Sequence, residues 1–183
     1  DDVLPYFKRA EGNLRGADAL HGASGPLSVQ DLRCPNPIAQ RFIDAGVQAA
    51  AQSVPAAVRG MRVYFEVSSG PFAAGEASFM GETLTRLGAR NIIPASLGPF
   101  PKINPEFVVR ADPDLIMVGS RSADGLATRP GWAQLRAIRE GRLCRFDAAQ
   151  SDVLIRPGPR MAEAARLMAA CLSDKAGQKP VRP

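Results

Sequence analysis

The sequence predicts an α/β fold: a three-layer α/β/α lobe with a mostly parallel sheet, preceded by a loop-rich N-terminal segment and a helix. Past about residue 50, apolar runs of strand length alternate with amphipathic helical stretches. Their order is strand, helix, helix, strand, helix, strand, helix, which implies parallel strands covered on both faces. Before that point turn signals dominate, in "EGN", "HGASGP" and "CPNP".

Composition fits a globular protein with one core and an appendage. The chain has 183 residues, of which 45% are hydrophobic and 22% charged. It contains no apolar run of about 18 residues, and it opens without a basic region followed by an apolar one, so neither a membrane span nor a signal peptide is visible. Because the first residue is Asp1 and not Met, this leaves the compartment open.

Charge and cysteine content exclude several classes of function. The net charge is +5, but the basic residues are scattered among acidic ones without a basic block, so no nucleic-acid partner is expected. Cys34, Cys144 and Cys171 are far apart and show no CxxC spacing. We therefore expect neither a zinc site nor a disulfide framework, and we interpret Cys144 and Cys171 as buried small hydrophobic residues.

The first regular element is predicted in "PNPIAQRFIDAGVQAAAQ". Asn36 can cap a helix, Pro37 suits its first position, and the apolar face would contain Ile38, Phe42, Ala45 and Ala49. "MRVYFEV", residues 61–67, follows as a strand rich in aromatic and β-branched residues, and "SSGPFAAG" follows it as a loop.

Capped helices and buried strands then alternate. "SFMGETLTRLG" predicts a helix with Ser78 as N-cap and Gly88 as stop, and its buried face would contain Phe79, Thr83, Leu84 and Leu87. In "NPEFVVRADPDLIMVG", Asn104 and Pro105 open a brief helix, and the buried strand Leu115 to Val118 follows.

The C-terminal third repeats this formula. "RPGWAQLRAIREG" predicts one helix from Pro130 to Gly141, before the short strand "LCRF". The last helix, "GPRMAEAARLMAACL", precedes a polar tail at residues 174–183, and its apolar stripe would contain Met161, Ala165, Met168 and Leu172.

Several separated segments of residues 50–173 carry a family resemblance. "MRVYFEVSSGPFAAGEASFMGETLTRLGARNIIP", "LGPFPKINPEFVVRADPDLIMVG" and "QSDVLIRPGPRM" resemble, in this order, the C-terminal lobe of ABC-transporter substrate-binding proteins of the cobalamin, haem and ferric-siderophore class. In that family two lobes are joined by a long helix, and the ligand lies in the cleft between them. The resemblance implies a periplasmic solute-binding lobe without catalytic residues or cofactor, whose partners are a metal chelate or tetrapyrrole and a membrane importer. Its exposed half-cleft could also self-associate.

Residues 1–49 resemble a different family. "DVLPYFKRAE", "HG..GPL" and "PNP.....F..AG" are similar to a segment of the glucose-methanol-choline oxidoreductases, which oxidise alcohols with FAD. The alternative function is therefore a fragment of such an enzyme, which is cytoplasmic if this segment is native. The chain lacks a GxGxxG after a strand and a C-terminal histidine, which the chemistry needs. A third hypothesis is a non-functional fusion of one lobe with a passenger segment.

The N-terminal segment offers few structural anchors. Its main apolar residues are Leu4, Tyr6, Phe7 and Leu14, among many turn residues, so we expect loops that depend on the lobe or a partner for order. His21, the chain's one histidine, could act as a general base, but no Ser or Asp arrangement is tied to it in the sequence. We interpret it as a loop residue.

Candidate ligand contacts come from the loops that end the predicted strands, where open α/β sheets place ligands. By the resemblance, these are "SSGPFAAG", "GPFPK" and the loop "QSDVL" before the last helix. Phe72 and Phe100 could form a stacking wall, or could pack within their loops. The polar candidates are Ser69, Lys102 and Asp152, for which solvated loop residues are at least as good a reading. Arg121 and Arg129 could attract an anionic chelate, although plain surface residues are the favoured reading of both.

Overall fold

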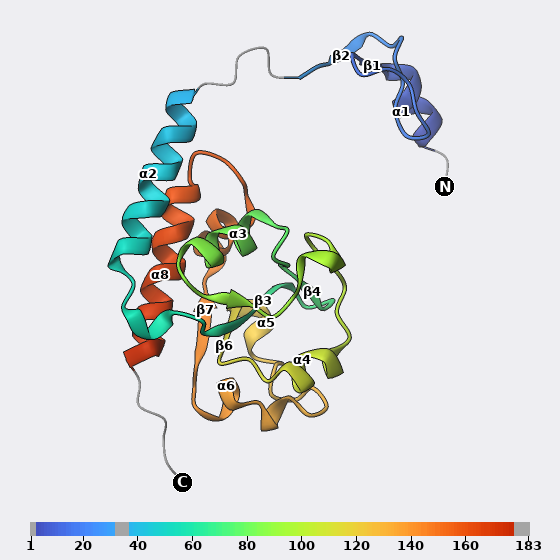
Figure 1. The fold of residues 1–183 in the computed structure, drawn as a ribbon. Coiled ribbons are helices and arrows are strands. Elements are labelled where there is room, and N and C mark those ends of the chain that lie inside the picture. Colours follow the sequence, from blue (N-terminus) through green and yellow to red (C-terminus); the bar gives the residue numbers. More distant parts are fainter. Residues whose placement is uncertain (1–2, 32–36, 178–183) are drawn as a thin grey trace. The chain divides into compact units, whose positions relative to one another are not determined.

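The chain divides into two compact units, Asp1–Pro37 and Ile38–Pro183. The computed structural model describes residues 3–31 and 37–177 (Figure 1). The division falls at the start of the helix that joins the two sequence resemblances, so all of this helix except its first residue, Pro37, belongs to the second unit.

The first unit is held by hydrogen bonds and not by an apolar core. It contains α1 (Leu4–Ala10) and a parallel pair of strands, β1 (Glu11–Asn13) and β2 (Leu27–Val29). The Glu11 carboxylate accepts hydrogen bonds from the Gly22 amide at 3.0 Å and from the Asn13 side chain at 3.1 Å. The predicted anchors do not form a core, because their exposed fractions run from 39% to 74%: Leu4, Tyr6, Phe7 and Leu14. About 30 residues are too few to close a core of their own.

The second unit is built on one mostly parallel sheet. Its strand order is β4-β3-β6-β7, with β5 paired to β3, and all the pairs are parallel except β3 with β4. The strands are β3 (Arg62–Ser68), β4 (Phe72–Ala73), β5 (Arg90–Asn91), β6 (Leu115–Gly119) and β7 (Leu143–Phe146). Val63, Ile116 and Leu143 share this sheet, as the sequence predicted.

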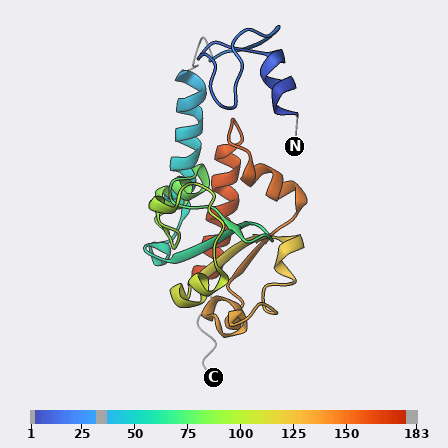
Figure 2. The same cartoon turned by 90° about the vertical axis from the view of Figure 1, so that its right-hand side faces the viewer.

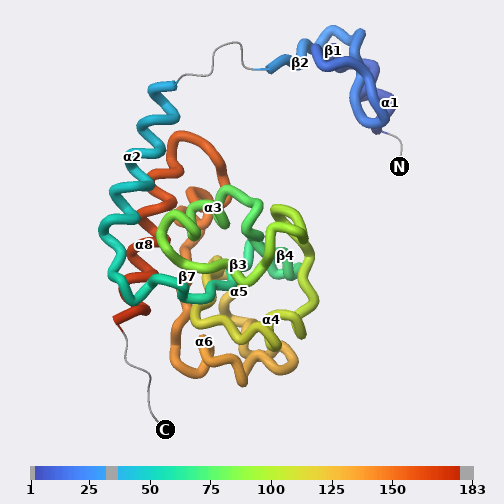
Figure 3. Tube along the Cα trace, in the orientation of Figure 1, coloured from blue at the N-terminus to red at the C-terminus, as the bar shows by residue number. Residues whose placement is uncertain are grey.

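Side chains alternate across the sheet between two hydrophobic cores. Val63 and Phe65 of β3 lie in the core with α2 (Pro37–Ser53), α3 (Phe79–Arg86) and α8 (Met161–Gly177). Tyr64 lies in the opposite core, covered by α4 (Pro105–Ala111), α5 (Ser120–Ala123) and α6 (Arg136–Arg139). Figures 1 and 2 show α2 and α8 along one side of the sheet, and the trace in Figure 3 shows α4 and α6 on the other side. The predicted three-layer α/β/α fold is confirmed.

Side-chain caps set the predicted helix starts. The Ser78 hydroxyl accepts a hydrogen bond from the Gly81 amide at 3.0 Å, and the Asn104 side chain accepts one from the Glu106 amide at 3.0 Å. At the other end of the chain, α8 continues to Gly177, so residues 174–177 are helical and the predicted tail begins later than expected. Residues 178–183 lie outside the described part.

Two C-terminal elements differ from the prediction. The single helix expected between Pro130 and Gly141 is a 3-10 turn, η3 (Trp132–Gln134), followed by α6, because Leu135 takes an extended ψ of 133° between them. The expected loop "QSDVL" is part of α7 (Ala148–Ile155). Its start is a capping box between Asp147 and Gln150, a signal that the sequence analysis missed. Two further 3-10 turns are η1 (Ala56–Val58) and η2 (Ala95–Leu97).

Helix α2 forms where it was predicted but buries another face. Ile38 and Phe42 are 73% and 68% exposed, and Ala45 and Ala49 are exposed as well. Val47 and Ala50 are buried instead. The reason is a close approach to α8: a Cβ placed on Gly46 would lie 2.3 Å from the Cβ of Ala162. Small side chains, and not large ones, therefore set this helix contact. The predicted cap, Asn36, lies outside the described residues.

The interpretation of the cysteines was wrong in one respect. Cys144 of β7 and Cys171 of α8 form a disulfide, with their Cα atoms 6.0 Å apart. Cys144 is buried, as expected, whereas Cys171 is only partly buried. The two residues are separated by 27 positions, and only the packing of α8 beside β7 brings them together. Cys34 lies outside the described part of the chain.

Candidate functional site

Three parallel strands end at one edge of the sheet. Because β3, β6 and β7 run in the same direction, their carboxyl ends lie together. Strand β3 is followed by residues 69–71, β6 by α5 and β7 by α7. In open α/β folds this edge is the usual position of a ligand site.

Two segments that carry predicted site residues lie side by side at this edge, and one of them includes the strand β4, where the sequence predicted only a loop. Phe72 and Lys102 form an antiparallel bridge. Backbone hydrogen bonds extend the contact on both sides of it: the Ala73 amide donates to the Pro101 carbonyl and the Ile103 amide to the Pro71 carbonyl, both at 3.0 Å. Phe100, two residues before Lys102, makes an edge contact with Phe79 at 6.2 Å between ring centroids. The structure thus brings Phe72, Phe100 and Lys102 together, with Ser69 in the turn before Phe72.

Buried polar groups behind these loops hold them in place. Asn91 is 3% exposed; its side chain donates to the Ala74 carbonyl at 2.8 Å and accepts from the Ile93 amide at 2.9 Å. The Ser78 hydroxyl donates to the Gly75 carbonyl at 2.7 Å. Sequence analysis missed Asn91 as a positioning residue. Its one signal was a side-chain amide next to the apolar pair "II".

The edge presents aromatic rings and cations to solvent. Phe72 and Phe100 are each 42% exposed, which is unusual for phenylalanine. Lys102, two residues after Phe100, is exposed, and so is Arg121 in α5, which follows the end of β6. In the part of the chain that the structure describes, no ion pair joins Lys102 or Arg121 to an acid. These two cations are therefore not neutralised by neighbours.

Asp152 does not belong to this group of residues. It lies on α7, where its carboxylate pairs with Arg156 at 2.7 Å. Together with Arg156 and Arg160 it lines a separate hollow of about 180 Å³ at the turn between α7 and α8. The structure therefore separates Asp152 from the aromatic pair.

Arg129 is held by a buried carboxylate. Its guanidinium makes two hydrogen bonds to Glu66, at 2.5 and 2.8 Å, and stacks on the Trp132 ring at 4.6 Å from the centroid. The Glu66 side chain is fully buried, and the Tyr64 hydroxyl donates to it at 3.3 Å. The hydrogen bonds that Arg129 donates to Glu66 raise the pKa of the guanidinium. Burial, with the nearby Glu66 charge, raises the pKa of Tyr64 above its usual value. Arg129 is thus neutralised and is not a free anchor for an anion.

The described residues offer no side-chain cluster typical of a metal site. No cluster of three or more His, Cys, Asp or Glu side chains that could hold a metal ion occurs among residues 3–31 and 37–177. His21 is paired with Asp18 in the first unit, so the expectation that no Asp is tied to this histidine was wrong. Dinucleotide folds hold a pyrophosphate at a glycine-rich turn between a strand and a long helix. In the described sheet, β3 leads to the antiparallel β4, β6 to the four-residue α5 and β7 to the eight-residue α7.

A match to a protein-family model shows to which family this chain belongs. The model of the periplasmic binding proteins matches residues 39–149, which is more than half of the chain. The chain belongs to the periplasmic binding protein family. No helix in the described ranges is both long and apolar enough to cross a membrane.

Solved structures of this family share the fold. The periplasmic haem-binding protein RhuT of Roseiflexus sp. RS-1 is 25% identical, with a TM-score of 0.62 over 76% of this chain and 56% of its own. The periplasmic vitamin B12 binding protein BtuF of Vibrio cholerae is 22% identical, with a TM-score of 0.61 over 76% of this chain and 52% of its own. The match therefore spans about half of each binding protein.

A second similarity connects the chain to an enzyme. The oxygen-dependent choline dehydrogenase of Paraburkholderia phymatum is 31% identical over 165 residues, which cover 86% of this chain and 26% of the enzyme. The chain spans about a quarter of the length of the curated relatives that it matches. The similarity to the glucose-methanol-choline oxidoreductases is real but partial.

Proposed function

We propose that the second unit is one lobe of a solute-binding protein that delivers a metal chelate or tetrapyrrole, such as a ferric siderophore, haem or cobalamin, to a membrane ABC importer. The observation that carries the proposal is the edge of the sheet at which Phe72, Phe100 and Lys102 lie together. Exposed rings offer a flat apolar surface, and nearby side-chain donors can fix the orientation of a ligand. Family membership and the haem and vitamin B12 ligands of RhuT and BtuF support this class.

The charge at this edge favours an anionic ligand. Lys102 and Arg121 have no acidic partner among the described residues, so each can form a charge-assisted hydrogen bond with a carboxylate. Asp152 is already paired with Arg156. Among the three ligand types, haem with its propionates and acidic siderophores therefore suit the edge better than cobalamin.

The compartment and the partners follow from the same proposal. A disulfide forms and persists in oxidising compartments, so the bridge between Cys144 and Cys171 supports a periplasmic location. The importer would be the delivery partner. A second copy of the chain could cover the exposed rings of Phe72 and Phe100, and the sedimentation coefficient at increasing protein concentration would reveal such self-association.

Ligand titration tests the proposal. Haem, cobalamin and ferric siderophores are titrated separately into the full chain, with binding followed by calorimetry and by the ligand's absorbance. We expect saturable binding of one ligand class. The double substitution F72A/F100A should weaken this binding about tenfold or more, because the loss of each ring costs about 1 kcal/mol or more of binding free energy. Phe42→Ala, which removes an even more exposed ring on α2 (68% against 42%), is the control and should leave the affinity unchanged.

Titration of a variant that lacks the two cations separates the ligand classes. Replacing Lys102 and Arg121 by Gln should weaken haem binding several-fold and leave cobalamin binding unaffected, because only haem carries carboxylates for these cations. Absence of saturable binding of every ligand at concentrations up to about a millimolar would reject the proposal and support the hypothesis of a non-functional fusion.

A second candidate is supported by the choline dehydrogenase similarity alone. It is a fragment of an FAD-dependent oxidoreductase, and the similarity covers 86% of this chain and 26% of the enzyme. A purified chain with flavin absorbance at about 450 nm would favour it, since enzymes of this type retain their cofactor. A colourless chain that gains no such band after incubation with FAD would count against it.

A further inference from the structure

The disulfide between β7 and α8 opens onto a cavity at the surface. The cavity has a volume of about 290 Å³, and both cysteines line it. Its other lining residues include Arg145, Gln150 and Lys175. Because both cysteines line the cavity, a molecule of the size of a small thiol can approach the bridge without unfolding of the lobe.

The two sulfur atoms differ in access. Cys144 is 4% exposed and lies in the apolar core on the inner face of β7. Cys171 is only partly buried, on the face of α8 that borders the cavity. An entering nucleophile therefore meets the Sγ of Cys171 first, and the Sγ of Cys144 lies behind it as the leaving group.

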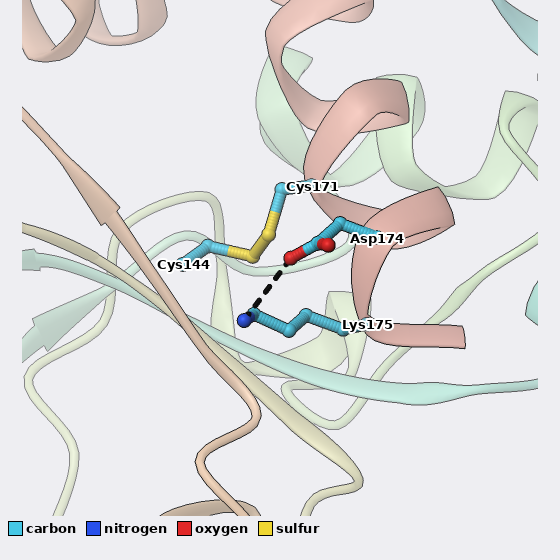
Figure 4. Close-up of a disulfide and its surroundings, with 4 residues drawn as sticks. All are labelled: Cys144, Cys171, Asp174 and Lys175. Carbon is cyan, nitrogen blue, oxygen red and sulfur yellow. Dashed lines mark ion pairs between the residues drawn. A yellow bond between two sulfur atoms is a disulfide. The ribbon is translucent and has the colours of Figure 1, made fainter. Parts of the chain in front are cut away.

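Charged groups lie beside the bridge. Lys175 follows Cys171 by one helical turn, and its amino group pairs with Asp174 at 3.1 Å (Figure 4). Arg145, next to Cys144 on β7, also lines the cavity. The lining thus carries two cations and one carboxylate, and Arg145 also pairs with Asp124 outside the lining at 3.0 Å. Positive charge favours both the approach of an anionic thiolate and the thiolate that leaves.

We propose that the bridge is a thiol–disulfide exchange site for small anionic thiols. The thiolate attacks Cys171 Sγ, the Sγ–Sγ bond breaks, and its electron pair goes to Cys144 Sγ, which takes up a proton. Cys171 then carries a mixed disulfide with the small thiol. A second thiolate attacks the small-molecule sulfur of that mixed disulfide and releases Cys171 as a thiol. In sum, two small thiols are oxidised to one disulfide, and the bridge is reduced to two thiols.

The test compares an anionic with a neutral thiol. The full chain, with Cys34→Ser so that only two cysteines react, is treated with 2-mercaptoethanesulfonate or 2-mercaptoethanol in native buffer, quenched with acid and mapped by peptide mass. Each rate is divided by the rate of the same thiol with a small linear disulfide. We expect the adduct on Cys171, and a normalised rate about two- to fivefold higher for the anionic thiol.

Two variants identify the role of the cavity charge. Lys175→Gln should bring the normalised rates of the two thiols closer together. Arg166→Gln removes an exposed cation from the same helix outside the cavity lining, and it should change nothing. Reaction in low urea separates the proposal from global opening, since exchange through the cavity is insensitive to urea below the unfolding transition.

Three results would overturn the proposal. One is a reaction rate that rises with urea in parallel with unfolding. Another is an adduct found on Cys144 instead of Cys171. The third is an equal normalised rate for the two thiols in the unsubstituted lobe. None of these outcomes depends on whether the lobe binds a chelate, so the inference stands or falls independently of the proposed function.

Discussion

His21 and Asp18 form a local pair that makes the first unit sensitive to pH. The imidazole Nδ1 lies 2.9 Å from both carboxylate oxygens. The Asp18 carboxylate also accepts hydrogen bonds from the amides of Leu20 and His21, both at 2.7 Å. The His21 side chain, helped by these amides, lowers the pKa of Asp18 to about 2, and Asp18 in turn raises the pKa of His21.

The pair predicts a raised pKa for His21, and its titration is easy to observe because the chain has a single histidine. The His21 contribution to stability is fully present below its unfolded pKa of about 6.5 and is lost as the pH rises through the raised folded pKa. The Asp18 contribution is present above about pH 4 and is lost as the pH falls through the lowered pKa. In an NMR titration of the imidazole protons, Asp18→Asn should return the pKa of His21 towards 6.5. Asp31→Asn, which removes the partner of Arg15, is the control and should leave it raised.

The contact between Glu66 and Arg129 predicts a large loss of stability when one partner is removed. The Glu66 side chain is fully buried, and that of Arg129 is 18% exposed. Glu66→Gln leaves a half-buried guanidinium without its counter-charge, so we expect a loss of about 3 kcal/mol in the free energy of unfolding in urea. Asp124→Asn removes the partner of Arg145 in an exposed pair and should cost less than about 1 kcal/mol. Equal losses in the two variants would contradict this argument.

At the scale of elements, the strands and helix starts that could be predicted are those that depend on residues close together in the sequence. The strands β3 and β6 are uninterrupted apolar runs, and the starts of α3 and α4 depend on the caps Ser78 and Asn104, which act within a few residues of their own position. Faces and pairings that depend on distant packing could not be predicted in this way. The buried face of α2, the bridge from Cys144 to Cys171 and the pairing of Arg129 with Glu66 all join segments far apart in sequence.

The candidate site shows the same limit. Loops at strand ends are a general property of α/β sheets, so the positions of Ser69 and Phe72 could be predicted. Which loops meet could not be predicted from local patterns, because the contact between Phe72 and Lys102 depends on Asn91 behind them. Asp152 was assigned to a loop that is in fact α7, and there it pairs with Arg156. The roles of these residues in ligand binding stay predictions.

The close crossing of α2 and α8 predicts the effect of one methyl group. Alanine normally stabilises a helix relative to glycine by about 0.5–1 kcal/mol. At Gly46, however, the added Cβ would lie 2.3 Å from that of Ala162, so Gly46→Ala should destabilise the lobe by about 1–3 kcal/mol in thermal unfolding. Gly177→Ala at the end of α8 meets no atom within 4 Å and should be neutral or slightly stabilising. A stabilised Gly46→Ala variant would show that the helices can separate without cost.

At the scale of the whole molecule, the two units predict unequal effects of truncation. A chain that begins at Ile38 keeps α2, whereas one that begins at Val54 loses Val47 and Ala50 from the core. We expect the first truncation to leave the unfolding transition of the second unit within about 1 kcal/mol of its original stability, and the second to lower it by several kcal/mol. Circular dichroism of the two truncated chains in urea measures both.

This comparison also tests where the lobe begins. If the chain that starts at Ile38 were as unstable as the one that starts at Val54, the first unit would contribute directly to the stability of the lobe, and the division at Pro37 would not be an energetic boundary. If both truncated chains were as stable as the full chain, the packing of α2 on α8 would contribute little. Only an unequal result agrees with the packing of Val47 and Ala50.

The covalent tie between Cys144 and Cys171 has a mechanical consequence. It encloses 27 residue steps, including all of α7, in a closed ring that tension on the two chain ends cannot straighten. At about 3.4 Å per residue, a chain stretched in an optical trap should extend about 90 Å less with the tie intact than after its reduction. A translocating motor that draws the polypeptide through a narrow pore would meet this ring as a doubled strand.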